Sequence, residues 1–317
     1  MTTEIRKLPF FPTPYPDESF YSILCRYHAR SASPSGLCTI KRLFGKHYVV
    51  SSTLHTAFRA EYMSKWVSPA SGLTPEHIVY EHSSYQYSLL GYIEKAATYP
   101  STYLQKELTE YLSIPYRKLY VYGQRIGKRH GNICFCPACA EEEKHVYGEP
   151  YWHVLHQLEG VRFCPVHGTP IVETDISYAQ RRHTFFPAFN VVDLSNVQTS
   201  SPVTSDISST ERKTFIRLAS DIAWLLKNGL RLSKSHSIIQ MLTGRESGYS
   251  LSSTIQVEKH NLPEELSILR KYMSIPVDKG FPRGLSAIAM SYPVVTAAMM
   301  GALYGSAKNF YKTVYCS

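Results

Sequence analysis

The sequence predicts a mainly α-helical protein that contains a small metal-binding unit. Apolar residues recur at helical spacing in the first hundred residues and again in the last hundred, which indicates a helical domain at each end. Near the middle, two short motifs each place a cysteine, a proline and then a second cysteine or a histidine within four positions. Such paired motifs are typical of ribbon-like or treble-clef-like zinc units.

These observations divide the chain into five parts. Residues 1–100 are expected to form an arm followed by a helix-turn-helix-like helical domain, and residues 211–317 a second helical domain. The metal-binding unit is assigned to residues 134–173. Connectors are expected over residues 101–133 and over residues 174–210, the second being rich in Ser, Thr and Asn.

The first eighteen residues are predicted to form an extended arm, because four prolines restrict the backbone there. We expect the first helix to begin with Asp17 as its N-cap and Glu18 in its first turn. Positions i, i+3, i+4 and i+7 then form one apolar face, which comprises Phe20, Ile23, Leu24 and Tyr27. Three polar residues fall off that face, namely Ser22, Arg26 and Arg30.

Three further short helices are expected before residue 100. The second follows a Ser-Pro-Ser-Gly turn and ends at Gly45, with Leu37, Ile40, Leu43 and Phe44 facing inward. The third begins at Ser51 or Ser52, with Leu54, Ala57, Phe58 and Tyr62 on its inner side. The fourth begins at Thr74, where a capping residue precedes Pro75 at the first helical position.

Two sets of cations are candidates for contact with DNA. Short helices joined by tight turns are typical of a helix-turn-helix unit, although any small helical bundle gives the same pattern. Its outward cations, which either contact DNA phosphates or are simply solvated, are Lys41, Arg42, Lys46 and Arg59. The tyrosine-rich first connector adds cations that suit a nucleic-acid backbone or merely solvate the segment, namely Arg117, Lys118, Arg125, Lys128 and Arg129.

The paired motifs predict one structural zinc site with Cys136, Cys139, Cys164 and His167 as ligands. Because the protein fills all four positions, no place is left for a catalytic water. Cys134 is an alternative to Cys136, but a C-x-C spacing suits a knuckle less well. His153 and His156 are interpreted as hydrogen-bonding or packing residues beside Trp152, and residues 141–143 as a solvated acidic turn.

The last third of the chain returns to helical spacing. The longest pattern comprises Phe215, Leu218, Ile222, Leu225 and Leu226 and ends at Gly229. Two shorter apolar faces follow, formed by Ile238, Ile239 and Leu242 and by Leu262, Leu266, Leu269 and Met273. Residues 285–304 are as long as a membrane span but contain serines, a threonine and Pro293, so a buried helix interrupted near Pro293 is expected instead.

Composition favours a nucleic-acid-binding protein of a reducing compartment. The chain has 317 residues, a formal net charge of +9 and a pI of about 9.1, which favours a polyanionic partner. Seven cysteines, four of them outside the predicted site, do not suggest a disulfide framework. The polar, proline-rich N-terminus resembles no signal peptide, so a cytoplasmic protein without membrane contact is expected. The absence of phosphate-loop, H-E-x-x-H and G-x-S-x-G motifs indicates a binding protein rather than an enzyme.

Several segments together resemble the TniQ/TnsD family of transposon target-selection proteins. The opening P-T-P-Y-P-D-E-S-F-Y-S-I-L-C-R at residues 12–26 is similar to the start of that family, and so is L-T-P-E-H-I at residues 73–78 followed by E-H-S at residues 81–83. The metal-binding segment carries the most specific likeness. In order, it holds C-P-x-C, Tyr147-Gly148, Tyr151-Trp152, His156-Gln157, Val161 and C-P-x-H-G. The stretch from Tyr292-Pro293 to Phe310 is similar to the family's closing helices.

The resemblance implies a target-site adaptor that recruits TnsC, the AAA+ ATPase regulator of the transposase. TnsD-like members bind double-stranded DNA at an attachment site, whereas other members act with a CRISPR RNA-guided complex. The CRISPR-linked members often carry a second cysteine-rich zinc unit just after the first. This chain has no cysteine between Cys164 and Cys316, which favours the TnsD-like branch. TnsD-like proteins usually continue with further DNA-binding helices, so weak sequence preference is expected of a chain that stops at Ser317.

Two interpretations of these features remain open at the level of sequence. The alternative to the adaptor is a zinc-containing transcription regulator that binds operator DNA without an ATPase partner. For the adaptor, aromatic residues in the proline-rich arm are candidates for docking the ATPase, namely Phe10, Phe11 and Tyr15. These rings could equally pack on the chain's own core.

Overall fold

The computed structural model describes residues 7–45, 60–96, 132–177, 184–192, 206–229, 263–275 and 292–316, together with residues 238, 242 and 277. Its helices are α1 (Phe20–Arg30), α2 (Gly36–Phe44), α3 (Ala60–Ser64), α4 (Pro75–Glu81), α5 (Tyr85–Ala96), α8 (Pro137–Tyr147), α9 (Ala188–Val191), α10 (Ser209–Asn228), α12 (Glu264–Met273), α15 (Pro293–Tyr304) and α16 (Ala307–Tyr315). Short 3-10 helices span Pro69–Ser71 and Leu155–Gln157. The strands are β1 (Asn132–Phe135) and β2 (Val172–Ser177), so the predicted mainly helical fold is confirmed.

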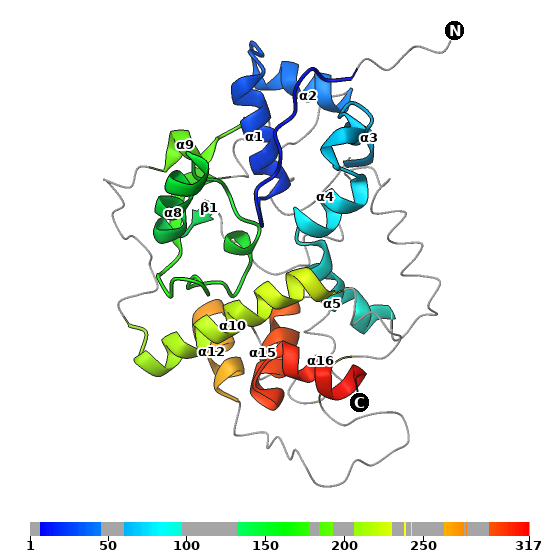
Figure 1. The fold of residues 1–317 in the computed structure, drawn as a ribbon. Coiled ribbons are helices and arrows are strands. Elements are labelled where there is room, and N and C mark those ends of the chain that lie inside the picture. Colours follow the sequence, from blue (N-terminus) through cyan, green and yellow to red (C-terminus); the bar gives the residue numbers. More distant parts are fainter. Residues whose placement is uncertain are drawn as a thin grey trace.

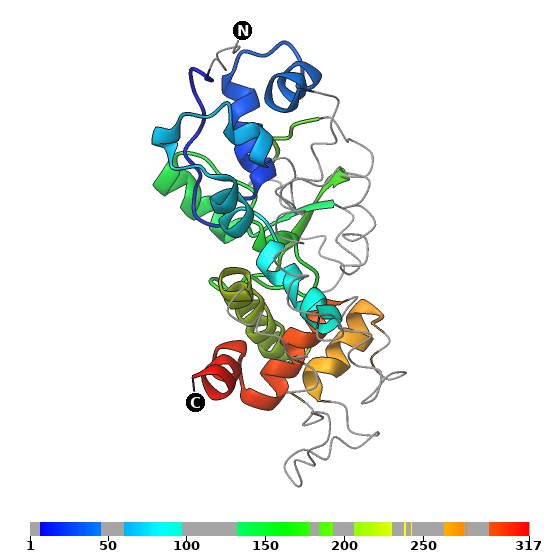
Figure 2. The same cartoon turned by 90° about the vertical axis from the view of Figure 1, so that its right-hand side faces the viewer.

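The elements form two stacked groups (Figures 1 and 2). Helices α1 to α4 lie at one end, with the metal-binding unit beside them, and α10, α12, α15 and α16 lie at the other end. Helix α5 reaches from the first group to the second, and its residues contribute to the hydrophobic cores of both.

Helix α1 begins two residues later than the sequence predicts. Ser19 is its N-cap, and its hydroxyl accepts a hydrogen bond from the Ser22 N–H. Asp17 instead has a left-handed backbone with φ of 55°, and its carbonyl accepts a hydrogen bond from Val154 N–H. The predicted apolar face is confirmed, since all four of its residues are buried. Glu18 is also buried rather than lying in the first turn of the helix.

The second and fourth helices follow the predicted capping signals. Helix α2 ends at Gly45, which has a φ of 70°, and α4 begins at Pro75 with Thr74 accepting a hydrogen bond from His77 N–H. Leu37 was expected to face inward but is 41% exposed, because it lies in the first turn of α2 beyond the core. The predicted start of the third helix and its predicted inner residues Leu54, Ala57 and Phe58 lie outside the described residues, which resume with α3 at Ala60.

The C-terminal helices also match their predicted faces. All five predicted apolar residues of α10 are buried, and Ser208 with Glu211 forms a complete capping box at its start. The described members of the two shorter faces are buried as well: Ile238, Leu242, Leu266, Leu269 and Met273. Pro293 occupies the first turn of α15, so in the described part of residues 285–304 a buried helix begins at this proline rather than crossing it.

The two strands pair in antiparallel fashion and frame the metal-binding unit. Cys134 pairs with Glu173 and Phe135 with Val172, with an irregularity near Asn132. Strand β2 continues to Ser177, beyond the predicted end of the unit at residue 173. The first connector lies almost wholly outside the described residues, and the second is described only at residues 174–177, 184–192 and 206–210.

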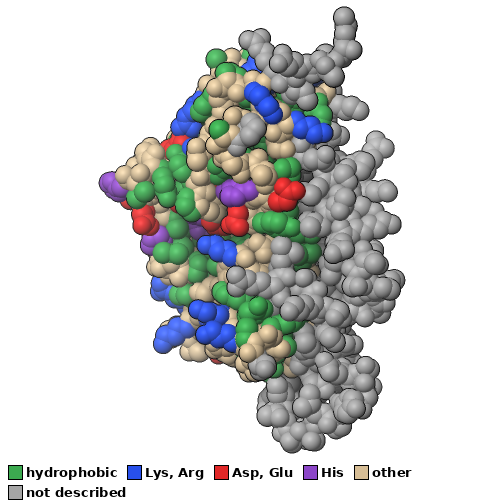
Figure 3. Space-filling view, turned by 45° about the vertical axis from the view of Figure 1, so that its right-hand side comes forward, with side chains coloured by type: hydrophobic (Ala, Val, Ile, Leu, Met, Phe, Trp, Pro, Cys, Tyr) green, Lys and Arg blue, Asp and Glu red, His purple; other side chains and the backbone are tan. Residues whose placement is uncertain are grey.

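Two hydrophobic cores meet at the metal-binding unit. The core under α1 to α4 includes Trp152 and Val172 from the unit, and the core of the C-terminal helices includes Cys139 and Phe163 from it. The unit therefore belongs to both ends of the protein. Within the described part of the chain, no helix combines the length and apolarity needed to cross a membrane. On the face shown in Figure 3, Lys and Arg side chains gather at the two ends, with acidic and histidine side chains between them.

Candidate metal centre

The first knuckle of the candidate centre is built into the start of α8. Cys136 is the N-cap of this helix and Pro137 is its first residue, which suits proline because its missing N–H is not needed there. The Cys136 sulfur accepts a hydrogen bond of 3.4 Å from Cys139 N–H. One helical turn therefore brings the two thiols to the same side.

The second knuckle is the turn of a small hairpin. Cys164 N–H donates to the Thr169 carbonyl at 2.8 Å, and Gly168 N–H donates to the Cys164 carbonyl at 2.8 Å. Gly168 has a φ of 63°, a conformation that glycine adopts without strain. The tight turn places His167 three residues beyond Cys164 and directs its ring toward the first knuckle.

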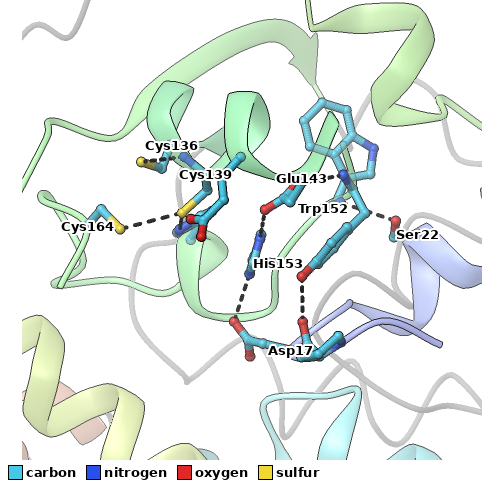
Figure 4. Close-up of polar contacts among 12 residues, drawn as sticks. Asp17, Ser22, Cys136, Cys139, Glu143, Trp152, His153 and Cys164 are labelled. Carbon is cyan, nitrogen blue, oxygen red and sulfur yellow. Dashed lines mark hydrogen bonds and ion pairs between the residues drawn. The ribbon is translucent and has the colours of Figure 1, made fainter. Parts of the chain in front are cut away.

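The four predicted ligands converge in the structure, and Figure 4 shows the cysteines at the start of α8 facing Cys164. The Cys139 sulfur lies 3.7 Å from the Cys164 sulfur and 3.3 Å from His167 Nδ1. His167 Nδ1 lies 3.8 Å from the Cys136 sulfur and 3.7 Å from that of Cys164. Zinc bond lengths give tetrahedral edges of about 3.6–3.8 Å between such donors. The cluster therefore fits one tetrahedral ion.

A carboxylate orients the histidine of the cluster. His167 Nε2 lies 3.3 Å from Glu142 Oε2, on the opposite side of the ring from the sulfurs. A proton on Nε2 that is donated to Glu142 leaves Nδ1 free to act as a ligand. Carboxylate–histidine pairs of this kind are the usual support of a metal-bound imidazole.

The thiols of the cluster perturb one another electrostatically. Hydrogen bonds from Cys139 and Cys164 lower the pKa of the Cys136 thiol, and the same contact with Cys136 raises the pKa of Cys139. Without a cation, Cys136 therefore loses its proton readily, whereas repulsion from its thiolate hinders the ionisation of Cys139. A bound cation would offset this repulsion because it attracts every thiolate in the set.

Cys134, the alternative to Cys136, is not part of the cluster. Its thiol donates to the Asn132 carbonyl at 3.4 Å, and the Gln157 side-chain amide pairs with its backbone N–H and carbonyl at 2.9 and 2.7 Å. The residue is fully buried, and burial raises the pKa of its thiol. Cys134 thus fixes β1 against the 3-10 helix that contains Gln157.

His156 lies beside the cluster without joining it. Its Nε2 is 4.0 Å from the Cys139 sulfur, and its Nδ1 has no hydrogen-bond partner among the described residues. Burial lowers its pKa well below the usual value, so the ring is neutral. A neutral ring with its proton on Nε2 supports the thiolate of Cys139 as a hydrogen-bond donor.

His153 is held between two carboxylates, as Figure 4 shows. Its Nε2 lies 2.5 Å from Glu143 Oε1, and its Nδ1 lies 3.2 Å from Asp17 Oδ2. Burial alone would lower the pKa of His153, but these carboxylates raise it to about 10. The predicted hydrogen-bonding role of this residue is confirmed.

The acidic residues 141–143 do not form a solvated turn, which corrects the sequence-based interpretation. They lie within α8, and Glu143 is buried because it faces the core at helical spacing from Cys136 and Cys139. Besides His153, it accepts a hydrogen bond of 3.1 Å from Tyr151 N–H. Glu143 also lies near enough to Cys139 and His153 to form a second group of potential ligand atoms.

A buried ion-pair network joins α1 to the metal-binding unit. Arg26 contacts Glu18 at 2.8 Å and Glu149 at 2.9 Å, and Arg30 contacts Glu149 at 2.7 Å. Burial raises the pKa of Glu18 to about 7, although Arg26 opposes the shift. Burial also acts to raise the pKa of Glu149, but Arg30 and Arg26 together hold it below its usual value. Arg26, expected only to lie off the apolar face, is therefore buried at an interface.

Trp152 completes this interface through its backbone and ring. Its N–H donates to Ser22 Oγ at 3.1 Å, and its carbonyl accepts from Ser19 N–H at 2.8 Å. The indole is fully buried and donates to the Phe186 carbonyl at 2.7 Å. The segment before α1 and the segment around Trp152 are thus joined by backbone hydrogen bonds like those between two antiparallel strands. Glu18 and His153 form a β-bridge within this pairing.

The three candidate docking residues of the arm differ in their surroundings. Tyr15 lies under the guanidinium of Arg26, whose central carbon is 3.7 Å from the ring centre, and its hydroxyl donates to Glu149 at 3.2 Å. Phe11 is half-buried against Tyr27, with ring centres 5.3 Å apart. Phe10 stacks more distantly on Tyr27 and remains 41% exposed. Phe10 is therefore the ring of the three with the most surface available to a partner.

Of the candidate DNA contacts, the structure describes two. Lys41 and Arg42 are exposed in the last turn of α2. The others lie outside the described residues: Lys46, Arg59, Arg117, Lys118, Arg125, Lys128 and Arg129.

The TniQ family model matches residues 9–171 of this chain. The chain belongs to the TniQ family. The matched region extends from the arm through α1 to α5 to the end of the second knuckle, so it contains both the cysteine–histidine cluster and the interface of Arg26 and Trp152.

A relative of this TniQ-family chain is the transposon Tn7 transposition protein TnsD of Escherichia coli. The two are 23% identical over 176 residues, which is 56% of this chain. The same match covers 34% of TnsD, so the matched part of this chain spans about a third of that protein's length.

Proposed function

We propose that this chain is a non-enzymatic adaptor of the TnsD type that selects a target site for transposition. It binds target DNA and recruits TnsC, the AAA+ ATPase regulator that brings the transposase. Membership of the TniQ family over residues 9–171 and the likeness to TnsD support this role. The lack of cysteines between Cys164 and Cys316 favours the TnsD type over the branch that acts with CRISPR complexes.

The main observation behind the proposal is that the arm, α1 and the metal-binding unit pack together through buried contacts. Arg26, Glu18 and Glu149 are buried together, and the backbone of Ser19 is bonded to Trp152. An adaptor needs a rigid surface so that a partner docks without a large loss of conformational entropy. The family match covers the segments that form these contacts.

The metal in this proposal is zinc with a structural role. Three thiolates and one imidazole at tetrahedral spacing are a preferred ligand set of zinc. Cys136, Cys139, Cys164 and His167 would fill all four positions, and Glu142 would orient His167. The ion would join α8 to the hairpin of the second knuckle and contribute to folding rather than to a reaction.

The proposal is tested by co-purification of the full chain with a TnsC-type AAA+ ATPase. Capture should require an ATP-type nucleotide and should increase when DNA is added, because the regulator assembles on DNA. Failure to capture TnsC under any nucleotide would overturn the adaptor and favour a zinc-containing transcription regulator. An operator-binding assay would then test that alternative.

The docking role of the arm is tested with single substitutions. Deletion of residues 1–16 would also remove Tyr15 from Arg26 and Glu149, so its effect on recruitment would not be specific. Phe10→Ala removes an exposed ring instead, and Leu37→Ala is a matched control because both side chains are 41% exposed. If Phe10 docks TnsC, the first variant should lose capture while the control retains it. Equal capture by both variants would exclude Phe10 as a docking residue.

A further inference from the structure

The C-terminal end of the chain is free of acidic residues. Residues 279–317 contain Lys279, Arg283, Lys308 and Lys312 but neither Asp nor Glu. Helices α15 and α16 lie within this stretch, and α16 exposes Lys308 and Lys312. Cations on α16 therefore have no acidic partner on their own helix or on α15.

Helix α16 is fixed to the second half of α10. Asp221 of α10 is buried, and its Oδ1 accepts a hydrogen bond of 2.8 Å from Ala307 N–H at the start of α16. One turn further along each helix, Trp224 meets Tyr311 with ring centres 5.7 Å apart. The two contacts show that α16 packs against the second half of α10, and in Figure 1 both helices run from left to right along the chain.

Three lysines flank the contact between Trp224 and Tyr311. Lys227 follows Trp224 by three residues on α10, Lys308 precedes Tyr311 by three residues on α16, and Lys312 lies one turn beyond Lys308. All three are exposed, and none forms an ion pair with a described residue. By contrast, Arg217 pairs with Glu265 and Lys271 with Glu211 elsewhere in this group of helices. Figure 3 shows Lys and Arg side chains gathered over this end of the protein.

We propose that this α10–α16 surface, formed by Lys227, Lys308 and Lys312 around Trp224, Tyr311 and Tyr315, binds the phosphate backbone of double-stranded DNA. The proposal rests on the proposed function, because it names the surface that performs the DNA-binding step. Unpaired lysines on a rigid helix pair suit phosphate contacts that position DNA without reading its sequence.

The aromatic residues favour a duplex over a single strand. Proteins that bind single strands expose aromatic rings on which bases stack. Here the rings are occupied by one another, since Tyr311 stacks on Tyr315 with centres 5.4 Å apart and planes 20° apart, and Trp224 packs on Tyr311. The α10–α16 surface therefore offers positive charge to the phosphate backbone of DNA, and it does not offer free aromatic ring faces on which bases could stack.

The test compares two triple variants of the full chain. Lys227→Gln, Lys308→Gln and Lys312→Gln together remove the charges of the α10–α16 surface, and Lys65→Gln, Lys144→Gln and Lys271→Gln remove three exposed charges elsewhere. Each triple lowers the formal net charge from +9 to +6, since 9 − 3 = 6. Binding to a fluorescein-labelled duplex of arbitrary sequence is measured by anisotropy over a series of salt concentrations.

The first triple should reduce the slope of log affinity against log salt by about 2.7, because each phosphate contact contributes about 0.9. The control triple should change that slope by less than about 1, since only long-range attraction is reduced. A variant with arginine at the three surface positions should retain the slope. Far-UV circular dichroism checks that each variant is folded.

The other outcomes separate the surface from the proposed function. If the unmodified chain binds no duplex at low salt, both the DNA binding in the proposed function and its assignment to the α10–α16 surface are wrong. If the unmodified chain binds the duplex but the two triple variants weaken binding equally, only the assignment to this surface is wrong. The same holds if the Lys227, Lys308 and Lys312 variant binds as well as the unmodified chain. Preference for a single strand of the same length, or for an RNA duplex, would overturn the assignment of the surface to duplex DNA.

Discussion

At the scale of single residues, the cluster offers a sharp comparison between two neighbouring carboxylates. Glu142 contacts His167 at 3.3 Å, whereas Glu141 contacts His145 at 3.4 Å on the exposed side of the same helix. Glu142→Gln should weaken metal retention by about 10- to 100-fold, because removal of the carboxylate beside a metal-bound histidine has effects of that size. The release of zinc to a colorimetric chelator measures this change.

Glu141→Gln is the matched control, since it removes the same charge from the same helix without touching His167. It should leave the rate of zinc release unchanged. Equal acceleration in both variants would show that only the overall charge near the site matters, and no acceleration in either would show that Glu142 does not orient the histidine.

The pair of carboxylates around His153 predicts a loss of stability at alkaline pH. Its folded pKa of about 10 lies above the ordinary histidine value of 6.5, so the folded state holds a proton more tightly than the unfolded chain does. The stabilisation is therefore complete below about pH 6.5 and is lost as the pH rises toward about 10. The expected loss is roughly 1–3 kcal/mol, the range for hydrogen bonds to charged groups.

Urea unfolding of the metal-loaded protein between pH 7 and about pH 10 measures this loss. The variant His153→Gln should be less stable at pH 7 and should show a flatter dependence on pH. If the two proteins lose stability in parallel as the pH rises, the titration of His153 is not the cause.

The contrast between the metal cluster and its surroundings shows which residues a sequence can identify. The four residues of the cysteine–histidine cluster are predictable because each pair is three residues apart, so local geometry decides their spacing. The buried bond between Arg26 and Glu149 joins positions 123 residues apart, and no local pattern indicates it. The interpretation of Glu143 is wrong for a related reason, because its partners are Tyr151 and His153 rather than its neighbours in the acidic run.

At the scale of elements, helix bodies were predicted better than helix starts. The apolar faces of α1 and α10 follow directly from a period of 3.6 residues. Asp17 is as good a local cap as Ser19, but its backbone and side chain are used to bind the segment around His153 and Val154. A tertiary contact thus moved the helix start, which local preference alone does not reveal. Helix α5 was not predicted, although two serines suited to capping, Ser83 and Ser84, directly precede its start at Tyr85.

The crossing of α5 and α10 gives a prediction at this scale. A Cβ atom at Gly229 would lie 2.0 Å from the Gln86 carbonyl oxygen, so the two backbones touch where α10 ends. Gly229→Ala should therefore separate the helices and lower the free energy of unfolding by about 2–4 kcal/mol, as for severe overpacking. Thermal and denaturant unfolding measure the change.

Gly148→Ala serves as the comparison, because a Cβ there meets no atom within 4 Å and only its φ of 80° is unfavourable. Its cost should be about 1–2 kcal/mol, the strain of a left-handed residue. If Gly229→Ala is no more harmful than Gly148→Ala, α5 and α10 do not press together as the structure indicates.

At the scale of the whole molecule, the metal-binding unit connects the two ends of the chain. Trp152 and Val172 belong to the core of the N-terminal helices, and Cys139 and Phe163 belong to the core of the C-terminal helices. The sequence suggests separate domains joined by connectors, because the pattern within each segment does not show which segments share a core. Residues of one unit in both cores therefore tie the two ends of the chain together.

Metal removal should therefore destabilise both ends together. Structural zinc sites contribute about 10–16 kcal/mol of apparent binding free energy, which exceeds the stability of most domains. Chelation should expose the amides of α1 and of α10 to hydrogen exchange in one step, and added zinc should restore their protection. Cys139→Ser should reproduce the effect, whereas Cys38→Ser, at an exposed position on α2, should not. Retained protection in α10 while α1 becomes exposed would show that the C-terminal helices fold independently of the metal. Retained protection in both helices after complete removal of zinc would contradict a structural role for the ion.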